Sequence, residues 1–285
     1  PGQEARPAAN RCAQPGAPVA VNKGDWPVIG RDVAGSRYEP EPGLRAEDLS
    51  RLKLKWAFAY PEGASGPVQV AGGRVFLASG DGQVHSLDAR TGCSYWSFDS
   101  GRTVRAVTIA AIGPDNAAGG RIGVFFGDDQ SAVTALDATS GALLWRTPVE
   151  THPLARITAP PVVYEGRVYA PVSGMEDPLT HDPGYACCTH RGSVAALDAA
   201  SGKLLWKSYT VQEEPKPLPK ASAEAVQHFA PAGGSVYTPL GIDTRRKLVY
   251  AATAEAYRRE NPAGAYSVIA FDMETGAHRW QRRFM

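Results

Sequence analysis

Apolar and polar residues alternate in short runs along most of the chain, and residues that favour turns separate these runs. Residues 73–76 and 166–169 begin two such runs, each with Gly-Arg before a β-branched residue. Short alternating runs bounded by Gly, Asp and Ser predict β-strands, and the sequence Ser-Gly-Asp-Gly at residues 79–82 predicts a hairpin. The 30 glycines and 23 prolines lie between the runs, as expected for many strands and tight turns.

One pattern occurs four times along the chain. Each copy has an Asp, a Gly four residues later and a Trp eight residues later. The copies span residues 87–96, 136–145, 197–206 and 271–280. The Asp carboxylate can accept backbone N–H groups of the following turn, and Gly supplies the positive φ that closes it. The Trp then falls on the returning strand, where its large ring can fill the wedge between neighbouring sheets.

The repeat predicts an all-β fold, a β-propeller of four-stranded antiparallel blades. We expect an N-terminal arm or linker at residues 1–25 and propeller repeats over residues 26–285. Residues 54–59 predict one further strand, which brings the total to about four to five blades. Because the chain ends soon after its fourth repeat Trp, we expect about half of a complete propeller.

The composition excludes some classes of partner. With 285 residues and 43% hydrophobic content, the chain can bury a sizeable core. Its 30 basic and 29 acidic residues give a net charge of +1, which argues against nucleic acid as a partner. Apolar stretches such as residues 123–126 are far shorter than the roughly 20 residues of a membrane-spanning helix, so we expect no membrane span.

The spacing of the repeats indicates where chemistry belongs. Successive Asp residues of the pattern are 49, 61 and 74 residues apart, so the units lengthen along the chain. Insertions into a repeat usually map to loops on one face, often the binding face. The added residues lie at about 175–190 in the third unit and 254–263 in the fourth. We therefore expect functional residues in these two loops.

Several stretches bear a family resemblance. The repeat resembles the blade motif of the eight-bladed quinoprotein dehydrogenases, which bind pyrroloquinoline quinone (PQQ) on the propeller axis, although non-enzymatic propellers have a similar motif. Longer stretches look like the polyvinyl-alcohol dehydrogenases, and the resemblance runs from Cys12 to Trp280. These stretches are residues 35–38, 52–58, 91–98, 152–158 and 187–198.

The resemblance implies a periplasmic enzyme that oxidises secondary or polymeric alcohols with PQQ and Ca²⁺ and passes electrons to a cytochrome c. In the family, the ortho-quinone accepts electrons, Ca²⁺ polarises one of its carbonyls, and an Asp removes the alcohol proton. That Asp belongs to a later blade, beyond Met285, so no catalytic residue is expected in this chain. The alternative is a non-catalytic propeller scaffold that mediates protein interactions.

The resemblance also implies a set of site residues. Arg105 matches an arginine that pairs with a quinone carboxylate, and Glu176 and Glu255 match the metal ligands. The implied cofactor-binding residues are Arg105, Thr158, Ser173, Gly174, Ser235 and Tyr237. Without the resemblance, Arg105 reads as a surface arginine, Thr158 as a strand-start hydroxyl and Glu176 as a loop carboxylate.

Two positions depart from the family pattern. Tyr237 stands where the family has a Trp that stacks on the quinone, which gives a smaller aromatic platform. Glu255 stands where the family has Asn, which keeps an oxygen donor and adds a negative charge. Calcium accepts such a ligand, but the extra charge disfavours a negatively charged cofactor. Both departures support the scaffold alternative.

The four cysteines allow several interpretations. Cys12 and Cys93 are a plausible disulfide pair that would fasten the N-terminal arm to the first blade. Cys187 and Cys188 could form a disulfide between adjacent residues, a feature of these quinoproteins, or remain two free thiols. His190 follows closely, but the sequence Cys-Cys-Thr-His is not the covalent haem motif, and two adjacent ligands suit tetrahedral zinc poorly.

Overall fold

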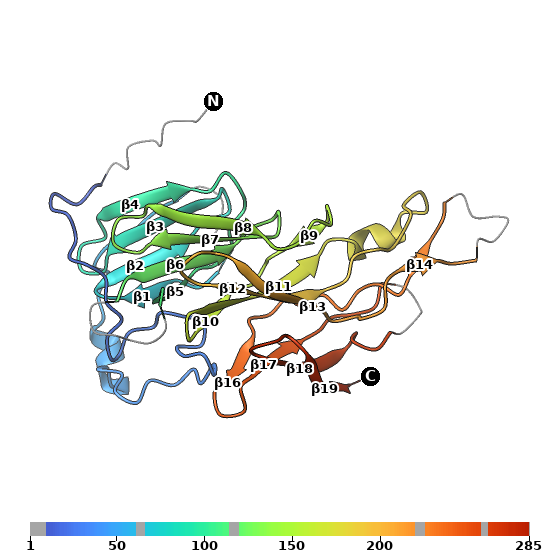
Figure 1. Ribbon diagram of the computed structural model, residues 1–285. Coiled ribbons are helices and arrows are strands. Elements are labelled where there is room, and N and C mark those ends of the chain that lie inside the picture. The colour runs from blue at the N-terminus through green and yellow to red at the C-terminus, as the bar shows by residue number, and fades with distance from the viewer. Residues whose placement is uncertain (1–9, 61–65, 114–119, 220–225, 258–261, 285) are drawn as a thin grey trace.

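Four antiparallel sheets of the same plan follow one another along the chain (Figure 1). The computed structural model describes residues 10–60, 66–113, 120–219, 226–257 and 262–284. Within each sheet the strands lie in sequence order, so every strand pairs with the next one. This confirms the predicted all-β fold of four-stranded antiparallel units. Within the described residues, no helix has the length and apolar character needed to cross a membrane.

The strand bounds follow the repeat. The first sheet contains β1 (Gln69–Ala71), β2 (Arg74–Ala78), β3 (Gln83–Asp88) and β4 (Ser94–Asp99). The second contains β5 (Thr108–Ala111), β6 (Ile122–Gly127), β7 (Ala132–Asp137) and β8 (Leu143–Pro148). The third contains β10 (Val162–Tyr164), β11 (Arg167–Gly174), β12 (Ser193–Asp198) and β13 (Leu204–Tyr209). The fourth contains β16 (Gly241–Asp243), β17 (Leu248–Ala252), β18 (Ser267–Asp272) and β19 (His278–Arg283).

Shorter elements supplement the four sheets. β9 (Ala155–Arg156) pairs with the end of β11. β14 (Lys216–Pro217) and β15 (Phe229–Ala230) form a two-stranded extension between the third and fourth sheets. Two short 3-10 helices are also present, η1 (Ala46–Arg51) and η2 (Asp177–His181). The helix η2 lies in the predicted insert of the third unit.

The same turn joins the last two strands of every sheet. In the first sheet, the Asp88 carboxylate accepts the backbone N–H groups of Arg90 at 3.1 Å and Thr91 at 2.7 Å, and Gly92 has a φ of 75°. Equivalent bonds occur in the other sheets, from Ser140 to Asp137, from Ser201 to Asp198 and from Thr275 to Asp272. The short-range sequence pattern therefore accounts for this turn.

Tryptophan side chains link successive sheets. The indole N–H of Trp96 in β4 donates to the carbonyl oxygen of Ala138 at 3.1 Å, in the turn of the second sheet. Trp145 in β8 and Trp206 in β13 donate in the same way to Ala199 at 3.0 Å and Met273 at 3.1 Å. Each acceptor is the residue after a repeat Asp. The Trp of one sheet thus binds the turn of the next.

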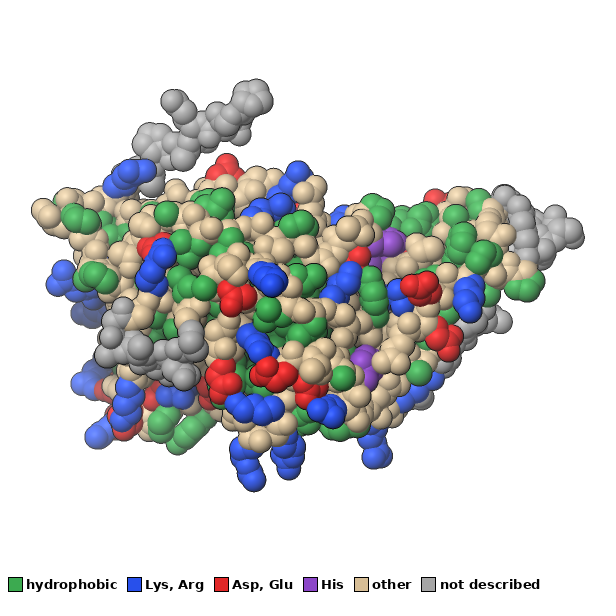
Figure 2. All heavy atoms as spheres, viewed as in Figure 1, with side chains coloured by type: hydrophobic (Ala, Val, Ile, Leu, Met, Phe, Trp, Pro, Cys, Tyr) green, Lys and Arg blue, Asp and Glu red, His purple; other side chains and the backbone are tan. Residues whose placement is uncertain are grey.

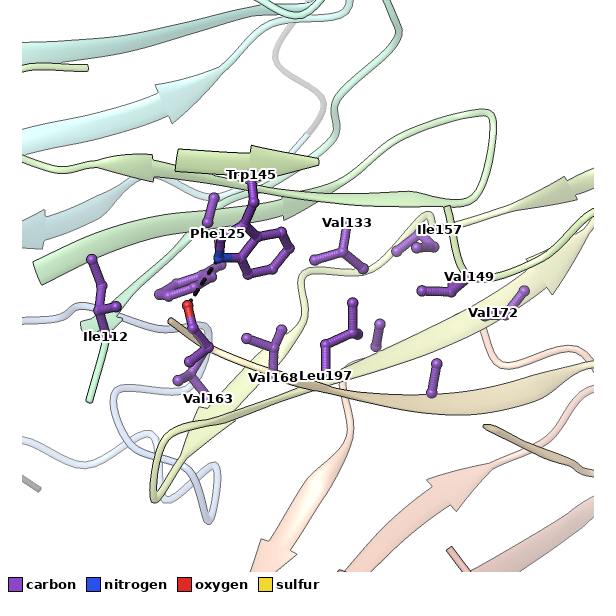
Figure 3. Packing of buried hydrophobic residues seen from close by; sticks show 14 of the residues in the cluster. Ile112, Phe125, Val133, Trp145, Val149, Ile157, Val163, Val168, Val172 and Leu197 are labelled. Carbon is purple, nitrogen blue, oxygen red and sulfur yellow. Dashed lines mark hydrogen bonds between the residues drawn. The ribbon is translucent and has the colours of Figure 1, made fainter. Parts of the chain in front are cut away.

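Apolar side chains fill the space between adjacent sheets. Figure 3 shows the cluster that joins Phe125 and Trp145 of the second sheet with Val168 and Leu197 of the third. Similar clusters join the first sheet to the second and the third to the fourth. Because burial stabilises by roughly 25 cal/mol per Å² of apolar surface, these inter-sheet clusters are the main source of stability in the stack.

Residues 54–59 do not form the strand that their pattern predicts. Leu54 is 87% exposed. Trp56 instead donates its indole N–H to the carbonyl oxygen of Ala89 at 3.1 Å and lies against Gly92, as the other tryptophans do at the turns of later sheets. Alternating residues become a strand only where a neighbouring strand supplies hydrogen bonds, and no described strand pairs with this segment.

The N-terminal arm is fastened to the first two sheets. The predicted disulfide between Cys12 and Cys93 is present. The buried Arg74 guanidinium donates to the carbonyl oxygens of Ala17 at 2.7 Å and Thr139 at 3.0 Å. The arm is therefore held by contacts with both sheets. Residues 1–9 of the predicted arm lie outside the described residues.

The innermost strands of three sheets are bridged by one segment, residues 26–33. Trp26 pairs with Val70 in β1, the amide of Ile109 in β5 donates to Pro27 at 2.9 Å, and the amide of Ile242 in β16 donates to Val33 at 3.1 Å. A single short segment can reach β1, β5 and β16 only if these strands lie close to one another. Such convergence of inner strands is typical of a propeller axis.

Candidate functional site

Most of the expected cofactor residues gather around the end of β11. Ser173 and Gly174 are the last two residues of this strand. Arg156 pairs opposite Ser173, and Thr158 follows two residues later. Ser235 and Tyr237 come from the segment between β15 and β16. The fold thus brings residues from three separate parts of the chain to one place.

Both the amide and the carbonyl oxygen of Gly174 form hydrogen bonds with side chains. Its amide donates to the Ser235 Oγ at 3.1 Å, and the Tyr237 hydroxyl donates to its carbonyl oxygen at 2.7 Å. A Cβ at this position would lie 2.3 Å from Nδ1 of the His190 ring. Only glycine therefore allows the ring and the strand to approach this closely.

The hydroxyls of Thr158 and Ser173 form a directed chain. Ser173 is fully buried and donates its proton to the carbonyl oxygen of Arg156 at 3.1 Å. The Thr158 Oγ1 lies 3.1 Å from the Ser173 Oγ. Because the single proton of Ser173 is already used, Thr158 is the donor in this contact. The pair fixes the backbone that leads into Gly174.

Sequence reasoning missed the buried Tyr257. Its hydroxyl lies 2.6 Å from the Ser235 Oγ and 3.3 Å from the His190 Nδ1. Burial raises the pKa of Tyr257, and the charges of Glu176 and Glu255 add to this effect. Burial, with a further contribution from His152, lowers the pKa of His190 to about 3. The predicted loop at residues 254–263 was the sequence signal that pointed to Tyr257.

Glu176 is fully buried and bonded to the chain itself. Its Oε1 accepts the Tyr185 hydroxyl at 2.8 Å and the Thr189 amide at 3.0 Å. Its Oε2 accepts the same Thr189 amide at 3.0 Å and the His190 amide at 2.7 Å. Burial raises the pKa of Tyr185, and the bond to Glu176 adds to this effect. The carboxylate is thus surrounded by donors from the third unit's insert.

Of the two alternatives for the adjacent cysteines, the structure has the disulfide. A disulfide joins Cys187 and Cys188, which are buried beside Ala232 and Tyr257. The amide of Phe229 in β15 donates to the carbonyl oxygen of Cys187 at 2.8 Å, and the amide of Cys188 donates to Phe229 at 3.1 Å. The disulfide therefore lies next to the residues around Gly174.

Arg105 and Glu255 are less tied to the cluster. Arg105 is exposed on the connection between β4 and β5, and no described side chain bonds to its guanidinium. Glu255 is partly buried and follows β17, and its carboxylate has no hydrogen bond or ion pair with a described residue. Burial raises the pKa values of Tyr237 and Tyr257, and the charge of Glu255 adds to this effect.

The residues present fit a planar, negatively charged quinone. The hydroxyl of Tyr237 is fixed to Gly174 while 38% of the residue stays exposed, so its ring can offer an aromatic face. Thr158 adds a hydroxyl whose oxygen can accept a further bond, and Arg105 adds a cation with no described partner. Both groups suit a ligand that carries carboxylates and hydrogen-bonding groups.

In the folded chain, the expected metal ligands Glu176 and Glu255 fit a calcium ion poorly. The oxygens of Glu176 are engaged by three chain donors and are inaccessible. Among the described residues, no three His, Cys, Asp or Glu side chains are grouped so as to hold a metal ion. The Glu255 carboxylate has no hydrogen bond or ion pair with a described residue, but Glu176 would have to release chain donors before it could bind a cation.

The stacked four-stranded sheets, linked by tryptophans and converging at their inner strands, define a propeller-like fold. A family model described as the glucose/ethanol/alcohol dehydrogenase β-propeller domain of the PQQ family matches residues 26–285. The chain belongs to this family.

Named relatives agree with this assignment. A polyvinylalcohol dehydrogenase from a Pseudomonas species is 38% identical over 264 residues, which are 92% of this chain and 41% of that protein. A polyvinylalcohol dehydrogenase from Sphingopyxis sp. strain 113P3 is 35% identical over 95% of this chain and 41% of its own length. The chain thus spans about two fifths of the length of these relatives.

Solved structures show the same fold. A quinohemoprotein alcohol dehydrogenase from Pseudomonas putida HK5 superposes with a TM-score of 0.70 at 23% identity, over 92% of this chain and 40% of that chain. The quinohemoprotein alcohol dehydrogenase from Comamonas testosteroni gives a TM-score of 0.68 at 21% identity, over 91% and 41% of the two chains. At these identities the likeness concerns the fold alone.

Proposed function

We propose that this chain forms the cofactor-binding propeller of a PQQ-dependent alcohol dehydrogenase. Its substrates would be secondary or polymeric alcohols such as polyvinyl alcohol, its compartment the periplasm and its electron acceptor a cytochrome c. The similarity to two polyvinylalcohol dehydrogenases supports the substrate class. The observation that carries the proposal is the group of hydroxyls and the tyrosine ring held around Gly174.

In this proposal the chain binds and orients the cofactor. PQQ would supply an acceptor for the two electrons that an alcohol loses, together with two protons, when it becomes a ketone. Arg105 would pair with a carboxylate of the quinone, because a guanidinium matches that group with two parallel bonds. Tyr237 would lie against the flat ring system, and the hydroxyls of Thr158 and Ser235 would fix its polar edge. The proposal assigns no step to calcium.

One observation favours a non-catalytic scaffold as the second candidate. Glu176, an expected metal ligand, is engaged by the amides of Thr189 and His190. A propeller that had lost its cofactor would keep its sheet packing while its former ligands formed such internal bonds. This candidate predicts no affinity for PQQ.

PQQ binding by the 285-residue chain separates the two candidates. Quenching of tryptophan fluorescence during a PQQ titration should be saturable for the wild type. Arg105→Gln should weaken binding about tenfold or more through loss of a charge-assisted contact. Arg102→Gln, which alters an exposed arginine of the same connection, serves as the control. If the wild type shows no saturable PQQ binding, the non-catalytic scaffold is the candidate that remains. Reduction of cytochrome c by the gene's complete product with a secondary alcohol then tests the activity.

A further inference from the structure

Glu176 binds both ends of the turn that carries the disulfide. We define this disulfide turn as residues 185–190, with Cys187 and Cys188 at its centre. The Tyr185 hydroxyl reaches Glu176 from one end, and the amides of Thr189 and His190 reach it from the other, at distances between 2.7 and 3.0 Å. A single carboxylate thus closes the turn from both directions.

Dipoles of the chain surround this carboxylate, and no described Lys or Arg pairs with it. The Nε2 of His152 lies 3.9 Å from the Glu176 Oε1. The His152 Nδ1 accepts the amide of Leu154 at 3.2 Å, so the ring proton resides on Nε2 and points to the Thr189 hydroxyl at 3.0 Å. A buried carboxylate in such surroundings depends on its hydrogen bonds.

We propose that Glu176 is the anchor of the disulfide turn and that its carboxylate is committed to the chain's own donors instead of to a cation. On its other side the turn is held by two backbone bonds with Phe229, by the amide of Gly233, which donates to the His190 carbonyl oxygen at 3.0 Å, and by a contact of 3.2 Å between the His228 Nδ1 and the Cys187 carbonyl oxygen. Removing the carboxylate would leave the amides of Thr189 and of the buried His190 without this acceptor, which destabilises the closed turn.

The anchor also connects the disulfide to the cofactor residues. The amide of His190 donates to the Glu176 carboxylate, and the ring of His190 contacts the Tyr257 hydroxyl. Tyr257 contacts Ser235, which accepts the amide of Gly174. A continuous series of contacts thus joins the turn to Gly174 through two hydroxyls. This proposal does not depend on which reaction the protein catalyses.

The rate at which dithiothreitol reduces each disulfide tests the anchor. Samples are quenched by alkylation at intervals, and the labelled cysteines are quantified by peptide mass spectrometry. Glu176→Met keeps the side-chain volume and removes every acceptor, so Cys187–Cys188 should be reduced about tenfold faster or more. Glu176→Gln keeps one acceptor oxygen for the amides and can donate to Tyr185, so its rate should stay within about threefold of the wild type.

Two controls make the experiment specific. Cys12–Cys93 joins the N-terminal arm to the turn between β3 and β4, and its reduction rate should be the same in all variants, which also reports that they are folded. Glu255→Gln removes a neighbouring charge without touching the turn and should leave both rates unchanged. Should Glu176→Met not fold, Tyr185→Phe removes one donor to the carboxylate and should accelerate reduction of Cys187–Cys188 alone.

Calcium distinguishes the anchor from a metal ligand. If the carboxylate is committed to the turn, millimolar Ca²⁺ should leave the reduction rate of wild-type Cys187–Cys188 unchanged. A Ca²⁺ effect on that rate, abolished equally by Glu176→Gln and Glu176→Met, would assign Glu176 to the metal and overturn the proposal. Equal rates in the wild type, Glu176→Met and Tyr185→Phe would overturn it as well. Neither result bears on PQQ affinity, which is measured separately.

Discussion

The indole ring of Trp145 fills the space that a side chain at Gly202 would need. A Cβ on Gly202 would lie 2.5 Å from Cδ2 of the ring, and the indole N–H donates to the carbonyl oxygen of Ala199 in the same turn (Figure 3). Equivalent contacts join Trp96 to Gly141 and Trp206 to Gly276. The glycine thus serves two purposes, because it also adopts a φ of 73°.

Replacing Gly202 with alanine should separate these two purposes. Gly73 has the same φ of 73°, and a Cβ there would meet nothing within 4 Å. Gly73→Ala should therefore lower the free energy of unfolding by about 1–2 kcal/mol through its backbone conformation alone. Gly202→Ala should cost roughly 1–3 kcal/mol more, because the ring must also move. Urea unfolding of both variants measures the difference, and equal losses would contradict the steric role of the ring.

Trp145→Phe should destabilise the stack more than Trp280→Phe. Trp145 is nearly buried and its N–H bonds Ala199, so the change leaves a carbonyl without its donor and a gap between two sheets. We expect a loss of about 2–4 kcal/mol. Trp280 is 45% exposed, and a surface substitution there should cost under about 1 kcal/mol. Thermal unfolding followed by circular dichroism makes the comparison. Similar losses would show that the inter-sheet bond contributes little.

The fold could be predicted because its main signals are local. Asp88, Gly92 and Trp96 lie within nine residues of one another, and each has one structural task that its chemistry dictates. The prediction was wrong for one predicted strand, which has no neighbouring strand among the described residues to pair with. Residues 54–59 have the alternation of a strand, yet Trp56 attaches the segment through its side chain. Alternating apolar and polar residues show which side chains can be buried, but a strand forms only where a second strand supplies hydrogen bonds.

Arg74 should be irreplaceable by lysine. Its guanidinium donates to Ala17 and Thr139 and lies 4.2 Å from the centre of the Tyr95 ring, so it joins the arm to two sheets. A lysine ammonium lacks the fork that reaches both carbonyls. Arg74→Lys should therefore speed hydrogen exchange of the amide of Val19, which bonds Thr139.

Arg121 supplies the matched control for this substitution. It belongs to the Gly-Arg run of the next repeat, just before β6, is 64% exposed at its side chain and pairs with Asp137 at 3.2 Å. Because exposed ion pairs contribute little, Arg121→Lys should leave exchange at Val19 unchanged. If Arg74→Lys also leaves it unchanged, the arm is held by its disulfide and other bonds instead.

The site could be predicted only in part. Ser173, Gly174 and Glu176 form a short motif, and the resemblance placed them near Thr158, Ser235 and Tyr237. Glu176 accepts the backbone amides of Thr189 and His190. Because nearly every residue has a backbone amide, the sequence does not show which amides will bind a side chain. Tyr257 likewise reaches Ser235 only through the packing of the third and fourth units. From the sequence alone, the engaged carboxylate of Glu176 cannot be told from that of Glu255, which bonds to no described residue.

His190 should make the protein less stable in mild acid. Burial lowers its pKa to about 3 in the folded state, whereas an unfolded histidine titrates near 6.5. Between these two values the unfolded chain binds a proton that the folded chain does not. Stability from this group is thus complete above about pH 6.5 and declines as the pH falls toward 3, by up to about 1.4 kcal/mol per pH unit.

Urea unfolding at pH 7, 6 and 5 tests this dependence on the wild type and on His190→Gln. The variant cannot take up the proton, so its stability should fall less between pH 7 and pH 5, although its stability at pH 7 should be lower because the contact with Tyr257 changes. The difference between the two pH profiles isolates His190 from the other titrating groups. Parallel profiles would mean that His190 becomes protonated in the folded protein. This protonation is costly because His190 is buried and its Nε2 has no hydrogen-bond partner among the described residues.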